Sequence, residues 1–435
     1  MNLHIICIAF FVICVLNSCE TKKISHAETK KVAILQNESG YSLLKDGKPF
    51  YVKGAAGFSN MESLKKAGGN TIRTWSTERA DSILDEAQKN DLSVVLGLFM
   101  LGEVHGFDYD DEEAVKKQFD DIKKQVLKYK DHPALLIWGV GNEMDIYSAD
   151  KTVENLKVWD AVNEICKMIH EVDPNHPTTT MIIPFRNTMW NINRRCPDLD
   201  ILSINTFGEI NKLSSKLNEP IWGWDGPYLV SEWGTLGWWE VEKTLWDAPI
   251  EATTTKKAEF YEKNYSKIQS DSSKCLGSCV FYWGQKQEKT PSWFSMFTPD
   301  GRPTEAVQVM EKYWKGKKEI NHFPKIDYML LNEKGAREDI FLKVGTLSNS
   351  QVFFTEPENE NVEIYWSIIP DMRNDKGIGQ KEEMSNEITG LITENNKSKI
   401  EFKAPIKDGP YRLYVYISDP NEQVAISNIP FFVIE

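Results

Sequence analysis

The segment ALLIWGVGNE at residues 134–143 decides how this chain is interpreted. Its first five residues form an apolar run that is typical of a buried parallel strand. Two glycines then allow the backbone to turn tightly, and the segment closes on Asn142 and Glu143 just past the predicted strand end. The segment PYLVSEWG at residues 227–234 repeats this order of apolar strand, glutamate (Glu232) and glycine. If both strands belong to one barrel, the two glutamates share the mouth at the C-terminal ends of its strands.

Strands and helices alternate along the chain from residue 50 onward. Between the strand segments lie segments with helical periodicity, such as the one in which Val115, Phe119, Ile122 and Val126 recur. An α/β fold, a (β/α)8 TIM barrel, is therefore predicted at residues 41–317. An open doubly wound sheet is the alternative, but GAAG at residues 54–57 lacks the glycine pattern that binds dinucleotides. The eight predicted strands are at residues 50–55, 70–75, 93–99, 134–140, 178–183, 200–205, 228–231 and 276–282.

The pattern changes in the last quarter of the chain, where short alternating segments rich in β-branched and aromatic residues are separated by Asn, Gly, Pro and Asp. They predict an antiparallel, immunoglobulin-like β-sandwich at residues 318–435. Because no group of reactive side chains stands out in it, we expect this domain to brace the barrel rather than to bind glycan. The seven predicted strands are at residues 326–331, 340–344, 351–355, 362–369, 399–403, 411–418 and 424–432.

The N-terminal residues resemble an export signal. Residues 5–16 are an almost unbroken apolar run, too short to span a bilayer, and they end in Leu16-Asn17-Ser18-Cys19. This ending resembles the lipobox of bacterial lipoproteins, in which the cysteine is acylated. We therefore predict a lipoprotein signal peptide at residues 1–19, a lipid anchor on Cys19 and a polar tether at residues 20–40. The protein is then expected in the bacterial cell envelope, in the outer membrane, the periplasm or at the cell surface. An ordinary cleaved signal would instead give a secreted protein.

Composition narrows the range of partners and cofactors. The 435 residues carry a formal net charge of −13, which argues against nucleic acid and against an anionic membrane surface as partners. Contact with a membrane is expected only through the lipid anchor on Cys19. Cys275 and Cys279 lack the accompanying cluster of His or Cys that a zinc site needs, so no metal and no other cofactor is predicted.

The two glutamates suit one particular chemistry. Cleavage of a glycosidic bond needs one carboxyl group to protonate the leaving oxygen and a second to act at the anomeric carbon. The two groups must differ in charge at the same pH, which mutual repulsion and a nearby cation can achieve. Each glutamate also has a structural interpretation, because Glu143 could stabilise a helix N-terminus and Glu232 could pair with Arg73. Their coincidence at the fourth and seventh strand ends, which face each other across a barrel mouth, favours catalysis.

The order of these residues resembles clan A of the glycoside hydrolases, with Asn142-Glu143 after the fourth strand and Glu232 after the seventh. The segments NTIRTW at residues 70–75 and WFSMFTPDGRP at residues 293–303 are similar to the catalytic barrel of family 2. The arrangement of lipoprotein leader, barrel and one C-terminal sandwich also resembles the family 158 endo-β-1,3-glucanases.

This resemblance implies roles for individual residues. Glu143 would be the acid/base and Glu232 the nucleophile. Asn142 would donate to the sugar 2-hydroxyl, and Arg73 would keep the nucleophile ionised. Trp283 would lie beneath the sugar at the cleavage subsite.

One position departs from the clan A pattern. Many members carry a tyrosine after strand six or seven that hydrogen-bonds the nucleophile, whereas Phe207 stands at that place here. The resemblance implies that Asn205 or Tyr282 substitutes for it. Trp233 belongs to a tryptophan-rich region around the seventh strand, where aromatic side chains are expected to stack on sugar.

Together these observations predict a glycoside hydrolase that retains the β-configuration by double displacement. The resemblance implies a neutral polysaccharide or oligosaccharide as the carbohydrate substrate, with a β-glucan, and a β-1,3 linkage in particular, favoured. The alternatives are transglycosylation at the same site, β-mannosidase or β-galactosidase activity, and a non-catalytic surface lipoprotein that binds glycan.

Overall fold

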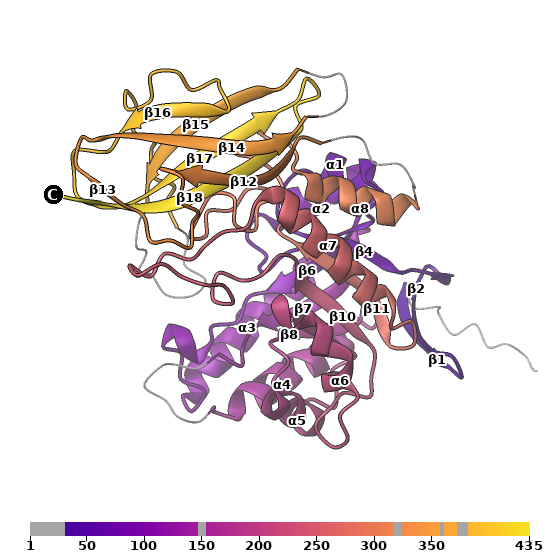
Figure 1. The fold of residues 1–435 in the computed structure, drawn as a ribbon. Coiled ribbons are helices and arrows are strands. Elements are labelled where there is room, and N and C mark those ends of the chain that lie inside the picture. Colours follow the sequence, from indigo (N-terminus) through magenta and orange to yellow (C-terminus); the bar gives the residue numbers. More distant parts are fainter. Residues whose placement is uncertain (1–30, 147–153, 317–322, 357–360, 372–381) are drawn as a thin grey trace, which may run out of the picture.

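The computed structural model describes residues 31–146, 154–316, 323–356, 361–371 and 382–435 (Figure 1). The predicted signal peptide at residues 1–19, with Cys19, and the first part of the predicted tether lie outside these ranges. Within them, no helix combines the length and the apolar character that a membrane span requires. A barrel and a separate β-sandwich make up the described chain, with the sandwich at the upper left of Figure 1.

Eight parallel strands close into a barrel, in the spatial order β10-β11-β4-β5-β6-β7-β8-β9. Their apolar runs are buried on both faces, because one face lines the barrel interior and the other packs on helices. In β6, for example, Val94 and Leu96 pack with the helix layer, whereas Val95 belongs to the interior cluster. The sequence prediction of eight barrel strands is confirmed, and their bounds are β4 Val52–Ala56, β5 Thr71–Arg73, β6 Ser93–Leu98, β7 Leu135–Asn142, β8 Thr178–Ile182, β9 Ile201–Asn205, β10 Tyr228–Trp233 and β11 Cys275–Phe281.

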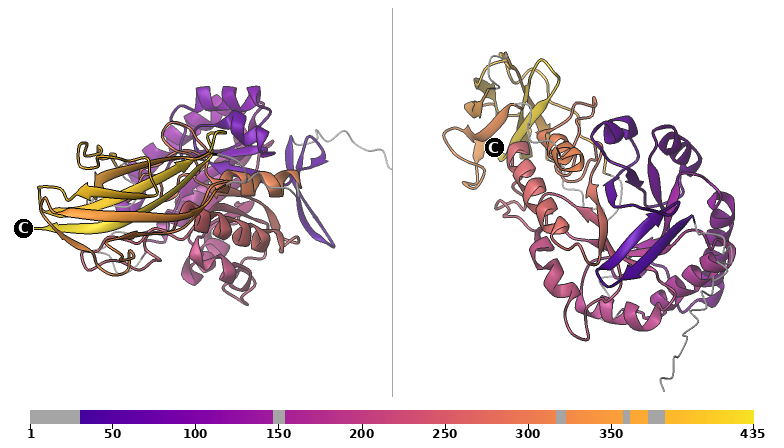
Figure 2. Two further views of the ribbon diagram at one scale, coloured as in Figure 1. Left: turned by 45° about the horizontal axis from the view of Figure 1, so that its top comes forward. Right: turned by 90° about the vertical axis from the view of Figure 1, so that its right-hand side faces the viewer.

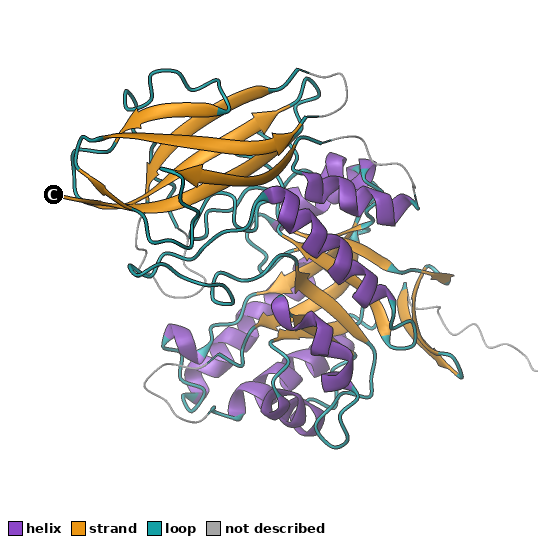
Figure 3. Ribbon diagram, in the orientation of Figure 1, coloured by secondary structure: helices purple, strands orange, loops and turns teal. Residues whose placement is uncertain are grey.

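Helices form the outer ring around the strands (Figures 2 and 3). In α3 the side chain of Asp111 caps the N-terminus by accepting from the amides of Glu113 and Ala114, and the buried face carries Ile122 and Val126. Two 3-10 turns, η1 Glu103–His105 and η2 Gly208–Lys212, follow β6 and β9. The helix bounds are α1 Met61–Lys66, α2 Ala80–Lys89, α3 Glu112–Tyr129, α4 Lys157–Val172, α5 Arg186–Arg195, α6 Leu213–Leu217, α7 Thr254–Gln269 and α8 Glu305–Lys315.

A small antiparallel sheet lies across the N-terminal end of the barrel (Figure 2, right). It consists of β1 Val32–Asn37, β2 Gly40–Lys45 and β3 Lys48–Pro49. The prediction of a tether over residues 20–40 is wrong at its C-terminal end, because β1 is already part of this sheet. Asn37 accepts a hydrogen bond from the amide of Ser39, which closes the turn into β2.

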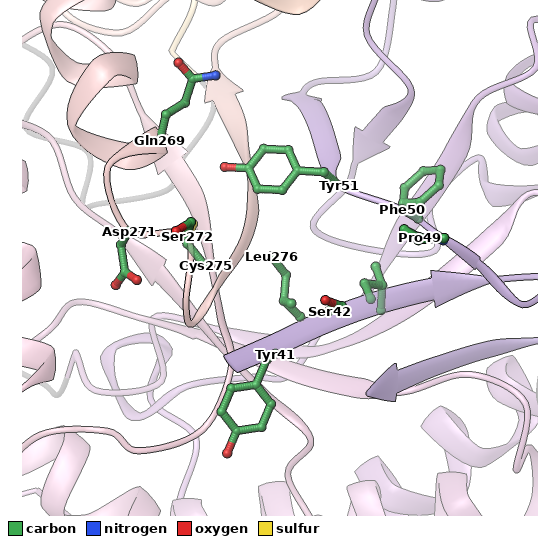
Figure 4. A pocket seen from close by; sticks show the side chains of 11 residues that line it. Tyr41, Ser42, Pro49, Phe50, Tyr51, Gln269, Asp271, Ser272, Cys275 and Leu276 are labelled. Carbon is green, nitrogen blue, oxygen red and sulfur yellow. The ribbon is translucent and has the colours of Figure 1, made fainter. Parts of the chain in front are cut away.

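A cavity of about 260 Å³ lies between this small sheet and the N-terminal end of the barrel (Figure 4). Tyr41, Phe50 and Tyr51 line it on one side, and Asp271 and Cys275 line it on the other. Because Cys275 begins β11, the cavity lies at the opposite end of the barrel from Glu143 and Glu232. It is therefore separate from the mouth that carries the two glutamates.

The C-terminal domain is a β-sandwich of two sheets, ordered β12-β14-β16 and β13-β18-β17-β15. The prediction of seven strands is confirmed. The prediction that all pair antiparallel is wrong for one pair, because β13 runs parallel to β18, and alternation along a strand carries no information on the direction of its partner. The bounds are β12 Lys325–Leu331, β13 Phe341–Lys343, β14 Leu347–Thr355, β15 Glu363–Pro370, β16 Lys399–Lys403, β17 Gly409–Ser418 and β18 Val424–Ile434.

A buried polar network joins the sandwich to the barrel. Asn428 in β18 donates to Oε2 of Glu251 at 2.6 Å, and Glu251 also pairs with Lys257 in α7. Arg412 in β17 donates to the carbonyl oxygen of Pro249 at 2.8 Å. Buried charges are stable only when they are paired and hydrogen-bonded, so these groups fix the sandwich against the barrel. This contact agrees with the bracing role expected from the sequence.

Candidate active site

A buried ion pair lies at the C-terminal end of the barrel. Glu232, near the end of β10, accepts from the Arg73 guanidinium at 2.5 Å, and Arg73 ends β5. Trp75 donates through Nε1 to the same carboxylate oxygen, Oε1, at 2.8 Å. The guanidinium of Arg73 also lies 4.3 Å from the Trp75 ring centroid, in cation–π geometry. Glu232 is thus held in one orientation by two donors that reach it from the β5 end of the mouth.

Glu143 stands just after β7 with an unusual backbone conformation. Its φ is +52°, a left-handed value that costs free energy for a residue with a side chain, and such values cluster at functional sites. Its amide donates to the carbonyl oxygen of Met181 in β8 at 2.8 Å. Its carboxylate accepts from Nδ2 of Asn205, at the end of β9, also at 2.8 Å. The side chain remains partly exposed, so a ligand can reach it.

Asn142 and Asn205 connect the two glutamates through a chain of hydrogen bonds. Oδ1 of Asn142 accepts from Nη2 of Arg73 at 2.5 Å and from Nδ2 of Asn205 at 3.3 Å. Ser231 in turn donates to Oδ1 of Asn205 at 2.7 Å and fixes its orientation. The chain therefore runs from Glu232 through Arg73, Asn142 and Asn205 to Glu143, and it brings five of the predicted residues together.

The electrostatic environment of Glu143 raises its pKa. Burial raises its pKa from the ordinary value of 4.5 to about 7, and the negative charge of Glu232 adds to this effect. The hydrogen bond from Asn205 and the charge of Arg73 act in the opposite direction. At neutral pH a carboxylic acid thus faces a carboxylate that is paired with Arg73, which is the division of roles required for acid-assisted glycosidic cleavage.

Comparison with known proteins identifies the type of barrel. Residues 79–239 match the family model described as glycosyl hydrolases family 2, TIM barrel domain. This part of the barrel is similar to the catalytic barrels of that family of glycoside hydrolases. No curated protein sequence matches the chain.

Three solved structures share the fold of this barrel. The β-glucuronidase of Faecalibacterium prausnitzii is 18% identical with a TM-score of 0.50, over 67% of this chain and 53% of that one. The β-D-glucuronidase of Dictyoglomus thermophilum is 14% identical with a TM-score of 0.50, over 66% and 54%. The β-glucuronidase of Ruminococcus gnavus, in complex with a C6-substituted uronic isofagomine, is 16% identical with a TM-score of 0.50, over 66% and 52%. At these identities the likeness shows the fold, and the present chain spans about half the length of the structures it matches.

Two residues that were predicted to bind substrate, Trp283 and Trp233, are buried away from the barrel mouth. Trp283 is fully buried against Trp314 and Phe297, with ring centroids 5.7 and 5.2 Å apart, so the prediction that it lies beneath the sugar is wrong. Trp233 is also fully buried, against Tyr265 and the helix layer, so the prediction that it binds substrate is wrong. In both cases the indole fills the space between strand and helix, where burial of a large apolar ring is most favourable.

Neither Asn205 nor Tyr282 takes the place of the missing tyrosine as a hydrogen-bond donor to Glu232. Asn205 bonds Glu143 rather than Glu232. Tyr282 stacks on Trp75 at 6.1 Å, and among the described residues its hydroxyl makes no hydrogen bond to Glu232. Trp75 itself supplies the indole donor to Glu232, a contact that was not predicted from the sequence. Because Trp75 lies two residues past the end of β5, strand alternation does not fix its direction, and the contact follows only from the closed barrel.

Proposed function

We propose that this chain is a retaining β-glycoside hydrolase with Glu232 as nucleophile and Glu143 as acid/base. The observation that carries the proposal is the hydrogen-bonded chain between the two glutamates, which runs through Arg73, Asn142 and Asn205. It provides a proton-bearing carboxyl group and an ion-paired carboxylate at one barrel mouth. Glycosidic cleavage requires these two carboxyl groups together at the C-terminal end of the strands, whereas the stability of a barrel does not.

The proposed reaction has two balanced steps. In the first, Glu232 attacks the anomeric carbon while the glycosidic C–O bond breaks, and Glu143 gives its proton to the departing oxygen. In the second, the Glu143 carboxylate takes a proton from water, whose oxygen attacks the anomeric carbon and releases Glu232. If a sugar hydroxyl replaces water in the second step, the same site transglycosylates.

Three further residues have proposed roles in substrate binding. The side-chain oxygen of Asn142 is occupied by Arg73 and Asn205, which leaves its Nδ2 group to donate to a sugar hydroxyl. Trp75 and Tyr282 form a stacked aromatic pair beside Glu232, with 21° between their ring planes. Aromatic faces of this kind suit the apolar face of a pyranose ring.

We propose a neutral glycan as the substrate, with a β-1,3-linked glucan first. Neutrality is supported by two cations at this end of the barrel, because Arg73 pairs with Glu232 and Lys286 pairs with Glu288, whereas Lys289 lies over the Trp238 ring. A uronate carboxylate would have to compete with those glutamates, which disfavours the glucuronides named for the structural neighbours. The β-1,3 linkage rests on the resemblance in domain order to family 158, and β-mannosides and β-galactosides are the next candidates.

The test is reducing-sugar release by the full chain from β-1,3-glucan, other β-glucans, mannan and galactan. Aryl β-glucoside, β-mannoside, β-galactoside and β-glucuronide are assayed beside them. Glu232→Gln, which keeps the side-chain volume, is the matched control and is expected to abolish release. Proton NMR of the first product should show the β-anomer. Binding of glycan without turnover by any substrate would replace this proposal with the non-catalytic alternative.

We also propose that Cys19 carries a lipid anchor that holds the protein in the bacterial cell envelope. The support is the Leu16-Asn17-Ser18-Cys19 ending of an apolar leader. Incorporation of labelled palmitate into the wild type and not into Cys19→Ser is the expected result. If the wild type and Cys19→Ser were released into the medium to the same extent, the result would support secretion instead.

A further inference from the structure

An exposed tryptophan projects from the loop after β10. Trp239 is 52% exposed, although its ring is supported from below by three other aromatic rings. The ring centroids of Trp238 and Phe207 lie 5.3 and 5.7 Å away in edge-to-face geometry, and that of Phe294 lies 6.2 Å away. A single exposed apolar side chain is common on protein surfaces. A large exposed ring that packs on three other rings, here called the aromatic base (Trp238, Phe207 and Phe294), indicates a binding surface.

The loop holds this ring in a fixed position. The Trp239 indole lies directly against Gly237, where an added Cβ would come within 2.4 Å of the ring. The carboxylate of Glu240 accepts from the amides of Gly237 at 2.8 Å and Gly208 at 3.0 Å, which ties the loop to the segment after β9. An added Cβ on Gly208 would meet that carboxylate at 2.8 Å and would displace the Glu240 side chain. A ring that is packed against neighbouring rings loses less conformational entropy when a ligand stacks on it than a free side chain does.

The aromatic base connects this ring to the two glutamates. Phe207 follows Asn205, which bonds Glu143, by two residues. Phe207 contacts Phe281 at 5.7 Å, and Phe281 contacts Trp75, the donor to Glu232, at 5.9 Å. Trp239 therefore stands at the far end of a continuous row of rings that begins beside Glu232.

We propose that Trp239 is the stacking platform of a second sugar subsite, which binds a neutral pyranose unit of the substrate chain away from the cleaved bond. This inference rests on the proposed function and deepens it, since it makes chain length a determinant of specificity. A pyranose presents C–H groups on its faces and hydroxyls at its rim. A flat, half-exposed indole can stack on the C–H groups of a pyranose face, and the hydroxyls at the rim of the sugar then remain in water.

The experiment compares two substrates of one sugar type, an aryl β-monoglycoside and a linear oligosaccharide long enough to reach Trp239. Trp239→Ala is expected to lower kcat/KM on the oligosaccharide by about tenfold and to leave the aryl monoglycoside within about twofold of wild type. Gly237→Ala displaces the ring without removing it and should give a loss in the same direction. Tyr328→Ala is the matched control, because Tyr328 is 51% exposed on the sandwich strand β12, and it should change neither substrate.

An equal loss on both substrates would show a structural role for Trp239, and no loss on the oligosaccharide would remove the subsite; either result overturns the inference. The Glu232→Gln background separates this outcome from failure of the proposed function. In that background, the Kd for the oligosaccharide by calorimetry should rise about tenfold on Trp239→Ala, whether or not the wild type hydrolyses the sugar. An unchanged Kd would equally overturn the inference.

Discussion

The indole nitrogen of Trp75 lies 2.8 Å from Oε1 of Glu232, the same oxygen that accepts from Arg73. Among the described residues, both side-chain donors to this carboxylate therefore use one oxygen. In the proposed mechanism the other oxygen, Oε2, forms the bond to the anomeric carbon. Two donors from the β5 end thus set the orientation of the nucleophile as well as its charge.

Trp75→Phe tests this arrangement, because it keeps an aromatic ring beside Arg73 and Tyr282 but removes the N–H donor together with part of the ring area. Hydrogen bonds to charged groups contribute roughly 1.5–3 kcal/mol, so we expect kcat/KM on an aryl glycoside to fall at least about tenfold. Trp366→Phe is the matched control, since the buried Trp366 donates through Nε1 to the carbonyl oxygen of Lys397 at 2.8 Å, within the sandwich. A loss of equal size in both variants would show that the donor to Glu232 has no special role.

The barrel was predictable because the physics of parallel strands is visible in the sequence. Strands buried on both faces need apolar runs, as in β6 and β7, and such runs recur eight times with helices between them. The position of Glu143 and Glu232 just where two such runs end then places both at one mouth. Strand ends and apolar runs are local properties, so they can be recognised without knowledge of the partners.

The failures concern the direction in which side chains point. Glu232 and Trp233 are neighbours in β10, and neighbours on a strand point to opposite faces, so Trp233 faces the helices once Glu232 faces the mouth. The alternation of side chains along β10 is therefore a sequence signal that places Trp233 in the helix layer. Trp283 follows the end of β11, where strand alternation no longer applies, and only its tertiary packing on Trp314 shows that it is core. The bond between Asn205 and Glu143 joins residues 62 apart in sequence and likewise depends on barrel closure.

Asn205→Ala should move the basic limb of the pH profile. The basic limb of kcat/KM is expected near pH 7, where Glu143 loses the proton that the leaving group needs. The N–H of Asn205 favours the ionised form of Glu143, so its removal raises the pKa and moves the limb to higher pH. Glu288→Gln removes a negative charge that raises the pKa of Glu143, so it should move the limb to lower pH. Shifts of both variants in one direction, measured from pH 4 to 10, would contradict this assignment.

Glu143→Gln should stabilise the fold at high pH. In wild type the folded state holds this proton between the ordinary pKa of 4.5 and a pKa of about 7, so stability falls as pH rises through that window. At about 1.4 kcal/mol for each pH unit, the window from 4.5 to about 7 corresponds to a loss of roughly 3 to 4 kcal/mol above pH 7, and solvent access to the partly exposed side chain reduces it. Glutamine keeps the bond from Asn205 and has no proton to lose. The free energy of unfolding of Glu143→Gln should therefore exceed that of wild type at pH 8 and not at pH 4.5. An equal difference at both pH values would exclude ionisation of Glu143 as the cause.

Asn428→Ala should destabilise the contact between the sandwich and the barrel more than removal of an exposed ion pair does. Asn428 donates to Glu251, whose charge is buried with Lys257, and loss of the donor leaves a buried carboxylate oxygen without that partner. A cost of about 1–3 kcal/mol in the free energy of unfolding follows. Arg337→Ala is the matched control, because Arg337 pairs with Glu242 across the same two domains but both side chains are largely exposed. Such a pair contributes at most about 1 kcal/mol.

Because the two domains share buried polar groups, wild type should unfold in one transition in denaturant, and Asn428→Ala should lower the midpoint of that transition. If Asn428→Ala and Arg337→Ala gave the same midpoint, the buried network would not be what couples the domains.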